Sequence, residues 1–177
     1  MTTEAYPTEN GVAPFAIART FDAPRDQMWK AWTERERLMQ WFGPKGFAMP
    51  AAMIDFRPGG TFHYCLESSE GQEMWAKFTY REIVAPERIC FVSAFSDEDG
   101  NVTRHPMCAA WPLEMLSTVT FVERAGRTTV TVEWAPINPT EAERKTFQAS
   151  YEGIQKGWTG TFDQLADYLA KEEAELV

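Results

Sequence analysis

Three charged side chains, Asp55, Arg57 and Glu82, are the groups in this sequence whose types and spacing could support acid–base chemistry. Asp55 and Arg57 alternate along one predicted strand and share a face, and Glu82 shares a face with Tyr80 in a second strand. At the end of an apolar pocket a carboxylate loses solvation, its pKa rises, and it can act as a general acid or base. The neighbouring turn sequence Pro58-Gly59-Gly60 favours a simpler interpretation, in which these charges form an ion pair that fixes the hairpin and the curvature of the sheet.

Other groups that commonly carry catalysis or bind metals are scattered along the chain. The two histidines, His63 and His105, and the three cysteines, Cys65, Cys90 and Cys108, form no His-x-x-x-His or Cys-x-x-Cys spacing. The sequence has no Gly-x-Ser-x-Gly elbow, no phosphate loop and no dinucleotide fingerprint. We therefore expect no metal and no cofactor. An odd number of widely spaced cysteines is typical of a reducing compartment, so we predict a cytoplasmic protein.

Wide apolar side chains are frequent: the 177 residues include 7 Trp, 12 Phe, 5 Tyr and 8 Met. Aromatic and methionine side chains in such numbers can line a ligand pocket as well as fill a core, and periodicity alone does not separate these two roles. We expect Trp29, Phe121, Val130 and Ile154 to belong to the core. The candidates for pocket lining are Trp41, Phe62, Met74, Phe78, Tyr80, Phe91, Trp111, Met115, Trp134, Tyr151 and Trp158.

Alternating apolar and polar residues predict seven strands, joined mostly by short turn signals. Such strands are antiparallel neighbours, and the chain lacks the strand–helix alternation that builds a parallel sheet, so we expect an α+β fold. The one long irregular connection spans residues 96–112, and a loop of this length is often functional. The predicted strands cover residues 15–21, 49–57, 61–66, 73–83, 88–95, 115–123 and 128–134.

Three helices are predicted outside these strands. Asp22 is expected to cap the first, before Pro24, and Thr33-x-x-Glu36 forms a capping box that begins the second. A further capping box, Thr140-x-x-Glu143, begins the longest helix, which runs to about residue 173. Its apolar residues recur every three or four positions from 147 to 169, so one stripe of this helix faces the sheet.

The longest helix can cover only part of a curved sheet of six or seven strands. The remaining apolar face must be closed by the short helices and the long loop, or be left as a cavity. The helix also contains Gly153, Gly157 and Gly160, and each glycine in a helix interior costs up to about 1 kcal/mol relative to alanine. These glycines indicate either close packing against the sheet or space kept free beside the helix.

Six groups of residues, spread in order over about residues 15–170, carry a resemblance to a known family. They are Ala23-Pro24-Arg25-Asp26-Gln27-Met28-Trp29, Trp41-Phe42-Gly43-Pro44, Asp55-Phe56-Arg57-Pro58-Gly59-Gly60, Tyr80-Arg81-Glu82-Ile83 with Pro86-Glu87-Arg88, Trp111-Pro112, and Gly157-Trp158-Thr159-Gly160-Thr161. With these motifs the chain resembles the homologues of the C-terminal domain of the heat-shock-protein-90 ATPase activator, which belong to the START-like (SRPBCC, helix-grip) superfamily.

The resemblance implies a helix-grip fold. Its parts are a curved antiparallel sheet of six or seven strands, two short helices after the first strand, and a long C-terminal helix across the sheet. START-like relatives bind lipids, sterols, polyketides or plant hormones, and some are cyclases or hydrolases. Because one fold hosts many activities, the resemblance implies an apolar pocket more strongly than any reaction.

Three functions remain open at this point. The first is binding of a small, mainly hydrophobic ligand between the sheet and the C-terminal helix. The second is a cavity enzyme, a cyclase or hydrolase, that uses Glu82, Asp55 or Tyr80 as acid or base. The third, a co-chaperone role in the stress response, is suggested by the family name alone. It is disfavoured because only about 14 residues precede the shared domain, whereas the activator has a separate N-terminal domain.

Charge and hydropathy limit the partners. The chain has 17 Lys plus Arg against 26 Asp plus Glu, a net charge of -9, and no basic cluster, which disfavours nucleic acid and anionic membranes. No apolar run approaches the roughly 18 residues that a membrane-spanning helix needs, so we expect no membrane insertion. We predict a flexible tail at residues 1–13 and a single domain at residues 14–174, and an exposed apolar patch could support a homodimer.

Overall fold

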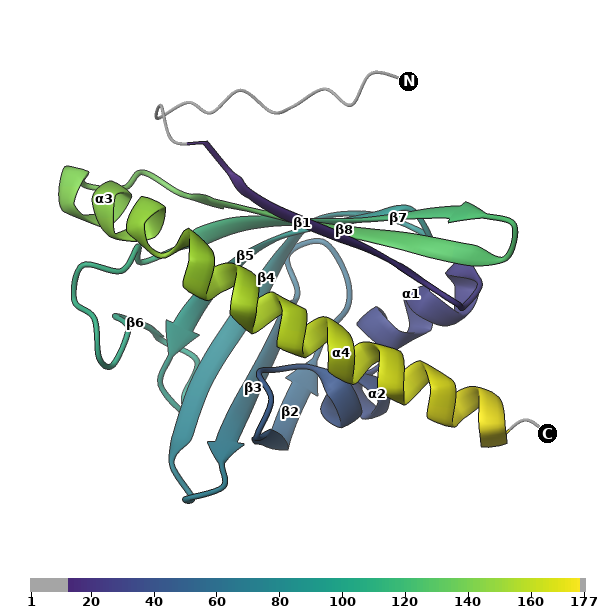
Figure 1. Ribbon diagram of the computed structural model, residues 1–177. Coiled ribbons are helices and arrows are strands. Elements are labelled where there is room, and N and C mark those ends of the chain that lie inside the picture. Colours follow the sequence, from purple (N-terminus) through teal and green to yellow (C-terminus); the bar gives the residue numbers. More distant parts are fainter. Residues whose placement is uncertain (1–12, 176–177) are drawn as a thin grey trace.

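The computed structural model describes residues 13–175, in which a curved antiparallel sheet is crossed by a long helix (Figure 1). Nearly all of the predicted flexible tail lies outside the described residues. The sheet path runs β1-β8-β7-β5-β4-β3-β2, and the short β6 pairs with β5 beside this path. The predicted α+β helix-grip fold is therefore confirmed. In chain order the elements are β1 (Phe15–Phe21), α1 (Arg25–Thr33), α2 (Arg35–Trp41), β2 (Phe47–Ile54), β3 (Thr61–Ser68), β4 (Glu73–Val84), β5 (Arg88–Ser96), β6 (Val102–Thr103), β7 (Met115–Arg124), β8 (Arg127–Pro136), α3 (Glu141–Ala149) and α4 (Tyr151–Glu175).

The predicted strands lie within a few residues of the observed ones, because alternation and turn residues mark their ends clearly. The second strand differs in a way that matters for the candidate charges. The sequence pattern predicted that Asp55 and Arg57 share a strand face. β2 instead ends at Ile54, so both residues lie in the turn before β3. The Asp55 N–H still donates to the Thr61 carbonyl across this turn, at 2.8 Å.

A β-bulge in β4 changes which side chains of this strand face the interior. Tyr80 pairs with Phe91, but the next pair joins Glu82 to Cys90, so Arg81 is an extra residue in β4. A bulge shifts the alternation by one position. Beyond it, Ile83 packs against the core and Glu82 no longer shares the face of Tyr80, which corrects the expectation from the uninterrupted alternation.

The first two helices begin differently from the prediction. α1 follows Pro24 as N-cap residue with no side-chain cap, so Asp22 does not cap it. The Thr33 hydroxyl donates to the Trp29 carbonyl at 2.8 Å instead of capping α2, whose N-cap residue is Glu34. The spacing of residue types predicts a possible cap but does not show whether the side chain bonds the helix start or, as with Thr33, a carbonyl of the preceding turn.

The C-terminal helical segment is two helices, not the single one predicted. Its start is confirmed, since Thr140 and Glu143 form a reciprocal capping box at α3. The break lies at Ser150, whose backbone leaves the helical region with ψ at 2° and whose hydroxyl donates to the Thr146 carbonyl at 2.7 Å. A serine that bonds back to the preceding turn commonly bends a helix.

The helix α4 lies diagonally across the concave side of the sheet, and α1 and α2 close one end of that side (Figure 1). Arg19 of β1 and Asp163 of α4 form an ion pair at 2.8 Å. The Thr161 hydroxyl of α4 donates to the carbonyl of Gly43, just after α2, at 3.0 Å. Because α1 and α2 occupy only one end of the concave side, the other end is left to the strands, α4 and the 96–112 loop.

Candidate functional site

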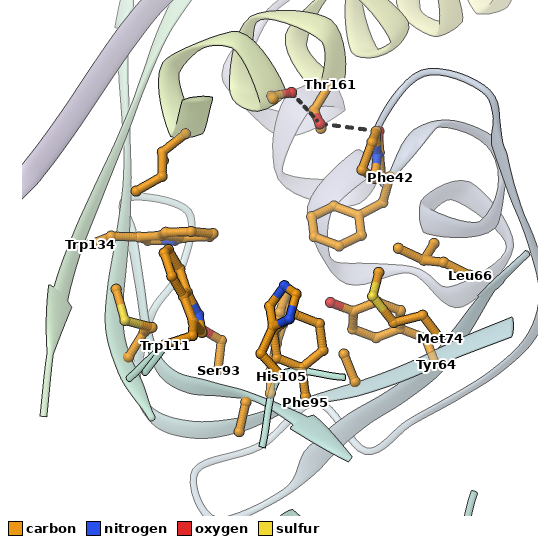
Figure 2. A pocket seen from close by; sticks show the side chains of 18 of the residues that line it. Phe42, Tyr64, Leu66, Met74, Ser93, Phe95, His105, Trp111, Trp134 and Thr161 are labelled. Atoms are coloured by element: carbon orange, nitrogen blue, oxygen red, sulfur yellow. Dashed lines mark hydrogen bonds between the residues drawn. The ribbon is translucent and has the colours of Figure 1, made fainter. Parts of the chain in front are cut away.

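An apolar cavity of about 290 Å³ lies between α4 and the concave face of the sheet, at the end that α1 and α2 do not fill (Figure 2). Its size is close to the lower end of the range of about 300–1,000 Å³ that is typical of small-molecule pockets. The wall is mostly aromatic and aliphatic. It consists of Phe42, Gly43, Pro44, Tyr64, Leu66, Met74, Ala76, Phe78, Phe91, Ser93, Ala94, Phe95, His105, Trp111, Pro112, Leu113, Met115, Trp134, Ile154, Gly157, Trp158 and Thr161.

Three parts of the chain position most of this wall. Central strands β3, β4 and β5 present every second side chain toward the cavity, as period-two alternation requires. The segment after α2 places the Phe42 ring in the cavity, and hydrogen bonds from Thr161 and Gln164 to the Gly43 carbonyl hold that segment against α4. The 96–112 loop adds His105 and Trp111 from the side opposite Phe42 (Figure 2).

Seven of the eleven candidate lining residues face this cavity: Met74, Phe78, Phe91, Trp111, Met115, Trp134 and Trp158. The other four do not line it. Trp41 is buried beneath α1 and donates its indole N–H to the Ala31 carbonyl at 2.9 Å. Phe62 is fully buried, Tyr80 packs edge-on against Phe56 at 5.0 Å, and Tyr151 packs against Phe147 at 5.2 Å.

Alternation identifies the side chains of a strand that point inward. It does not show which of these side chains are covered by helices and which face a cavity. Phe62 and Phe78 belong to neighbouring strands and share a face, yet only Phe78 reaches the cavity. Two residues further along β3, Tyr64 lines it, although it was not among the candidates. Ile154 was expected in the core and also lines the cavity.

Several lining residues were missed for a second reason: nothing in a loop sequence shows where a side chain points. His105 and Phe42 both lie outside regular elements and both reach the cavity. His105 contacts Phe95 at 4.8 Å and Trp111 at 6.2 Å between ring centroids. The length of the 96–112 connection and the candidate Trp111 were the sequence signals that this segment contributes to the site.

The three charged candidates are not brought together, and none of them lines the cavity. Asp55 and Arg57 form an ion pair at 2.8 Å in which both side chains are more than half exposed. Glu82 pairs with Arg88 across the tight turn between β4 and β5. These positions agree with the interpretation of the charges as ion pairs at turns, although the partner of Glu82 is Arg88, not Arg57.

The polar groups of the cavity wall are uncharged side chains. No aspartate, glutamate, lysine or arginine occurs among the lining residues. Tyr64 is buried, and burial raises the pKa of its hydroxyl above the ordinary value. Burial lowers the pKa of His105, because an apolar environment disfavours the imidazolium form. At neutral pH both side chains are therefore neutral.

The glycines of α4 border open space. A Cβ atom at Gly153 or Gly157 would meet no atom within 4 Å, so neither glycine packs closely against the sheet. At Gly160 the nearest atom is the Lys45 side chain, at 3.4 Å. Gly157 is exposed and also lines the cavity, which indicates that the cavity meets solvent beside this residue.

A single carboxylate, that of Glu143, attaches the 96–112 loop and the residue that follows it to α3. Glu143 is 7% exposed, and its Oε2 accepts hydrogen bonds from the Leu113 N–H at 3.1 Å and from the Arg104 guanidinium at 3.3 Å. Its Oε1 accepts the Thr140 N–H of the capping box at 3.3 Å. Burial opposes ionisation, but the hydrogen bonds from Thr140 and Leu113 and the charge of Arg104 outweigh it, so the pKa of Glu143 lies below its ordinary value.

Replacing Glu143 with glutamine is expected to lower the free energy of unfolding at neutral pH by about 1–3 kcal/mol, because hydrogen bonds to a charged acceptor are lost. Since the folded-state pKa is depressed, this stability is present above the ordinary carboxyl pKa and disappears as the pH falls through the folded-state value. Urea unfolding of both proteins at about pH 7 and about pH 4 measures the difference.

The matched control for this substitution is Glu141→Gln. Glu141 lies in the same first turn of α3, but it is exposed and pairs only with Lys145, so its replacement should change stability by less than about 0.5 kcal/mol. Equal stabilities of Glu143→Gln and Glu141→Gln at neutral pH would show that the carboxylate does not hold the loop.

The remaining reactive groups lie apart from one another. Within residues 13–175, no group of three or more His, Cys, Asp or Glu side chains is placed to hold a metal ion. Cys65, Cys90 and Cys108 are free thiols, and burial raises the pKa of Cys65 and of Cys90. His63 lies on the outer face of the sheet with its ring 4.9 Å from that of Trp75. Over the same residues, no helix is long and apolar enough to cross a membrane.

Comparison with solved structures shows the same fold in bacterial proteins. A protein from Nitrosomonas europaea has a TM-score of 0.72 at 23% identity and covers 91% of this chain and 96% of that chain. A protein from Mycobacterium smegmatis has a TM-score of 0.72 at 21% identity, covering 88% of this chain and 90% of its own. The AHSA1 protein from Silicibacter pomeroyi has a TM-score of 0.66 at 20% identity, covering 90% and 99%.

A search of curated proteins found no match to this chain. The family model described as activator of Hsp90 ATPase homolog 1-like protein matches residues 22–170, from the end of β1 to near the end of α4. The matched segment includes every residue that lines the cavity. This chain belongs to the family of activator of Hsp90 ATPase homolog 1-like proteins.

Proposed function

We propose that this protein binds a small, mainly hydrophobic ligand in the cavity between α4 and the sheet. The observation that carries the proposal is the cavity itself, about 290 Å³ of space with an almost entirely apolar wall. An interior of this size that held no ligand would forfeit the dispersion contacts that a packed core supplies. The resemblance to START-like proteins, whose members bind lipids, sterols or polyketides, supports the same function.

The position of the charged residues favours binding over catalysis. A cyclase or hydrolase of the kind considered from the sequence would need Glu82, Asp55 or Tyr80 at the ligand. All three lie outside the cavity wall, and the two carboxylates are held in ion pairs. The family name, which refers to an ATPase activator, is the sole support for a co-chaperone role.

The test is a ligand panel against the wild-type protein and against two variants with a filled cavity. Ala76 lines the cavity from β4, so Ala76→Phe places a ring in the space a ligand would occupy. Ser93→Leu fills the space from β5. We expect one or more two-ring aromatics, fatty acids or flavonoids to raise the melting temperature and change tryptophan fluorescence, and both variants to weaken that binding at least about 10-fold.

Val122→Phe is the control, since it adds the same ring at a position of β7 that is 61% exposed and outside the cavity. Circular dichroism shows whether each variant is folded. If folded Ala76→Phe and Ser93→Leu bind as tightly as the wild-type protein, or if no panel member binds to any of the proteins, the proposal is wrong.

A further inference from the structure

Some hydrogen-bond donors of the cavity wall have no partner among residues 13–175, and their positions narrow the class of ligand. Tyr64 from β3 and His105 from the 96–112 loop each bring such a donor to the apolar wall (Figure 2). The inference that follows rests on the proposed ligand-binding function and deepens it.

The Tyr64 hydroxyl is the first of these donors. Figure 2 shows its oxygen pointing into the cavity, away from the strand that carries it. Burial alone accounts for its raised pKa, since no group of residues 13–175 forms a hydrogen bond with it. The cavity that this hydroxyl faces meets solvent beside Gly157, so a ligand that excludes water must supply an acceptor or leave the hydroxyl unpaired, at a cost of about 1–3 kcal/mol.

The second donor is the Nε2–H group of His105. The Nδ1 atom accepts the backbone N–H of Met107 at 3.0 Å, so the neutral ring carries its proton on Nε2. No group among the described residues accepts a hydrogen bond from that nitrogen. The ring contacts Phe95 and Trp111 edge-on, and these contacts fix it at the cavity wall.

The two aliphatic hydroxyl groups of the wall, those of Thr161 and Ser93, already have partners. The Thr161 hydroxyl donates to the Gly43 and Gly157 carbonyls, each at 3.0 Å. The Ser93 hydroxyl is paired with that of Ser117 at 3.2 Å. Because the wall contains no charged side chain, it offers neither a carboxylate to pair with a ligand ammonium group nor a cation to pair with a ligand carboxylate.

We propose that the ligand is an uncharged, mainly aromatic molecule with a carbonyl or similar acceptor oxygen, and that Tyr64 and His105 donate hydrogen bonds to this oxygen. The apolar remainder of the molecule packs against the rings of Phe42, Phe78 and Trp134. A site built with unpaired donors rejects analogues that lack the acceptor, because those analogues leave the donors buried and unsatisfied.

The experiment compares probes of nearly equal shape. Acetonaphthone carries a ketone oxygen, ethylnaphthalene replaces that oxygen with hydrogen, and naphthoate carries a charged carboxylate. We expect the ketone to bind wild-type protein roughly 3- to 10-fold more tightly than the hydrocarbon, the value of one or two neutral hydrogen bonds. We also expect it to bind more tightly than naphthoate.

Tyr64→Phe should remove this preference and should bind ethylnaphthalene at least as tightly as the wild-type protein does. Tyr80→Phe is the matched control, since Tyr80 is also a buried tyrosine but lies outside the cavity wall. At the second donor, His105→Leu should reduce ketone affinity, and His105→Gln, whose amide can place an N–H near the position of Nε2, should retain it in part. Tyr64→Phe without ligand should be at least as stable as the wild-type protein.

The outcomes separate this inference from the proposed function. Binding of ketone and hydrocarbon with equal affinity, or a ketone preference that survives in Tyr64→Phe, overturns the donor assignment but leaves a hydrophobic binding site. Tighter binding of naphthoate overturns the conclusion that the ligand is uncharged. Failure of every probe and every panel member to bind overturns the proposed function itself.

Discussion

Replacing Trp158 with alanine is expected to lower the free energy of unfolding by about 3–5 kcal/mol, the largest effect of any single substitution considered for this protein. Trp158 of α4 is only 8% exposed. Its ring stacks on that of Trp32 at 6.3 Å and contacts Trp134 and Phe162, each at 5.6 Å between centroids. Removing the indole therefore opens a void where α4, α1 and β8 meet, and it also removes part of the cavity wall.

Urea unfolding followed by circular dichroism measures this change, and ligand titration of the folded variant should show weaker binding. Trp75→Ala is the control. Trp75 is half-buried on the outer face of β4, where its ring packs on His63, so its loss should cost clearly less and leave ligand affinity unchanged. A Trp158→Ala protein within about 1 kcal/mol of the wild-type stability would contradict the role given to this ring.

Replacing Gly60 with alanine is expected to lower the free energy of unfolding by about 3 kcal/mol or more, because it overpacks a tight turn. A Cβ atom at this position would lie 2.0 Å from the backbone carbonyl oxygen of Asp55. That oxygen belongs to the turn between β2 and β3, and the Tyr80 N–H donates to the Gly60 carbonyl at 2.9 Å. The backbone must move to relieve the clash, and this movement disturbs the strand that carries Tyr64.

The adjacent Gly59 provides a matched control, because the cost of replacing it comes from backbone conformation and not from a steric clash. Its φ of 84° favours glycine, but a Cβ atom there would meet no atom within 4 Å. Gly59→Ala should therefore cost only about 1–2 kcal/mol, the conformational penalty of a left-handed residue. Thermal and urea unfolding of both variants gives the comparison, and a Gly59→Ala cost equal to or larger than that of Gly60→Ala would contradict the steric argument.

The cavity arises because helices cover the two ends of the concave side of the sheet to different extents. At one end of the concave side, Trp41, Phe62 and Tyr80 are buried in the core to which α1 and α2 also contribute. At the other end the same strands continue, but only α4 and the 96–112 loop cover them. The aromatic candidates divide between the packed end and the cavity end. Their number in the sequence therefore showed that large apolar side chains are available, but not which of them line a cavity.

The charged candidates show the limit of sequence patterns at turns. The motif that contains Asp55 and Arg57 was identified correctly as a hairpin with an ion pair, because Pro58 and the two glycines after it mark a tight turn. The position of Glu82 was wrong because the bulge at Arg81 inverts the alternation of β4. A bulge depends on how two strands pair, and nothing in the residues of one strand shows it.

The sequence by itself determined the order and type of the main elements, the antiparallel sheet and the inward face of most strand positions. These features follow from short-range physics, namely the periods of 2 and 3.6 residues and the residues that turns and caps require. Only the tertiary structure decided the break at Ser150, the location of the cavity and the inward direction of Tyr64 and His105. Such features depend on contacts between segments far apart in the chain. The energy of these packing contacts exceeds the energy differences between local backbone preferences, so packing decides.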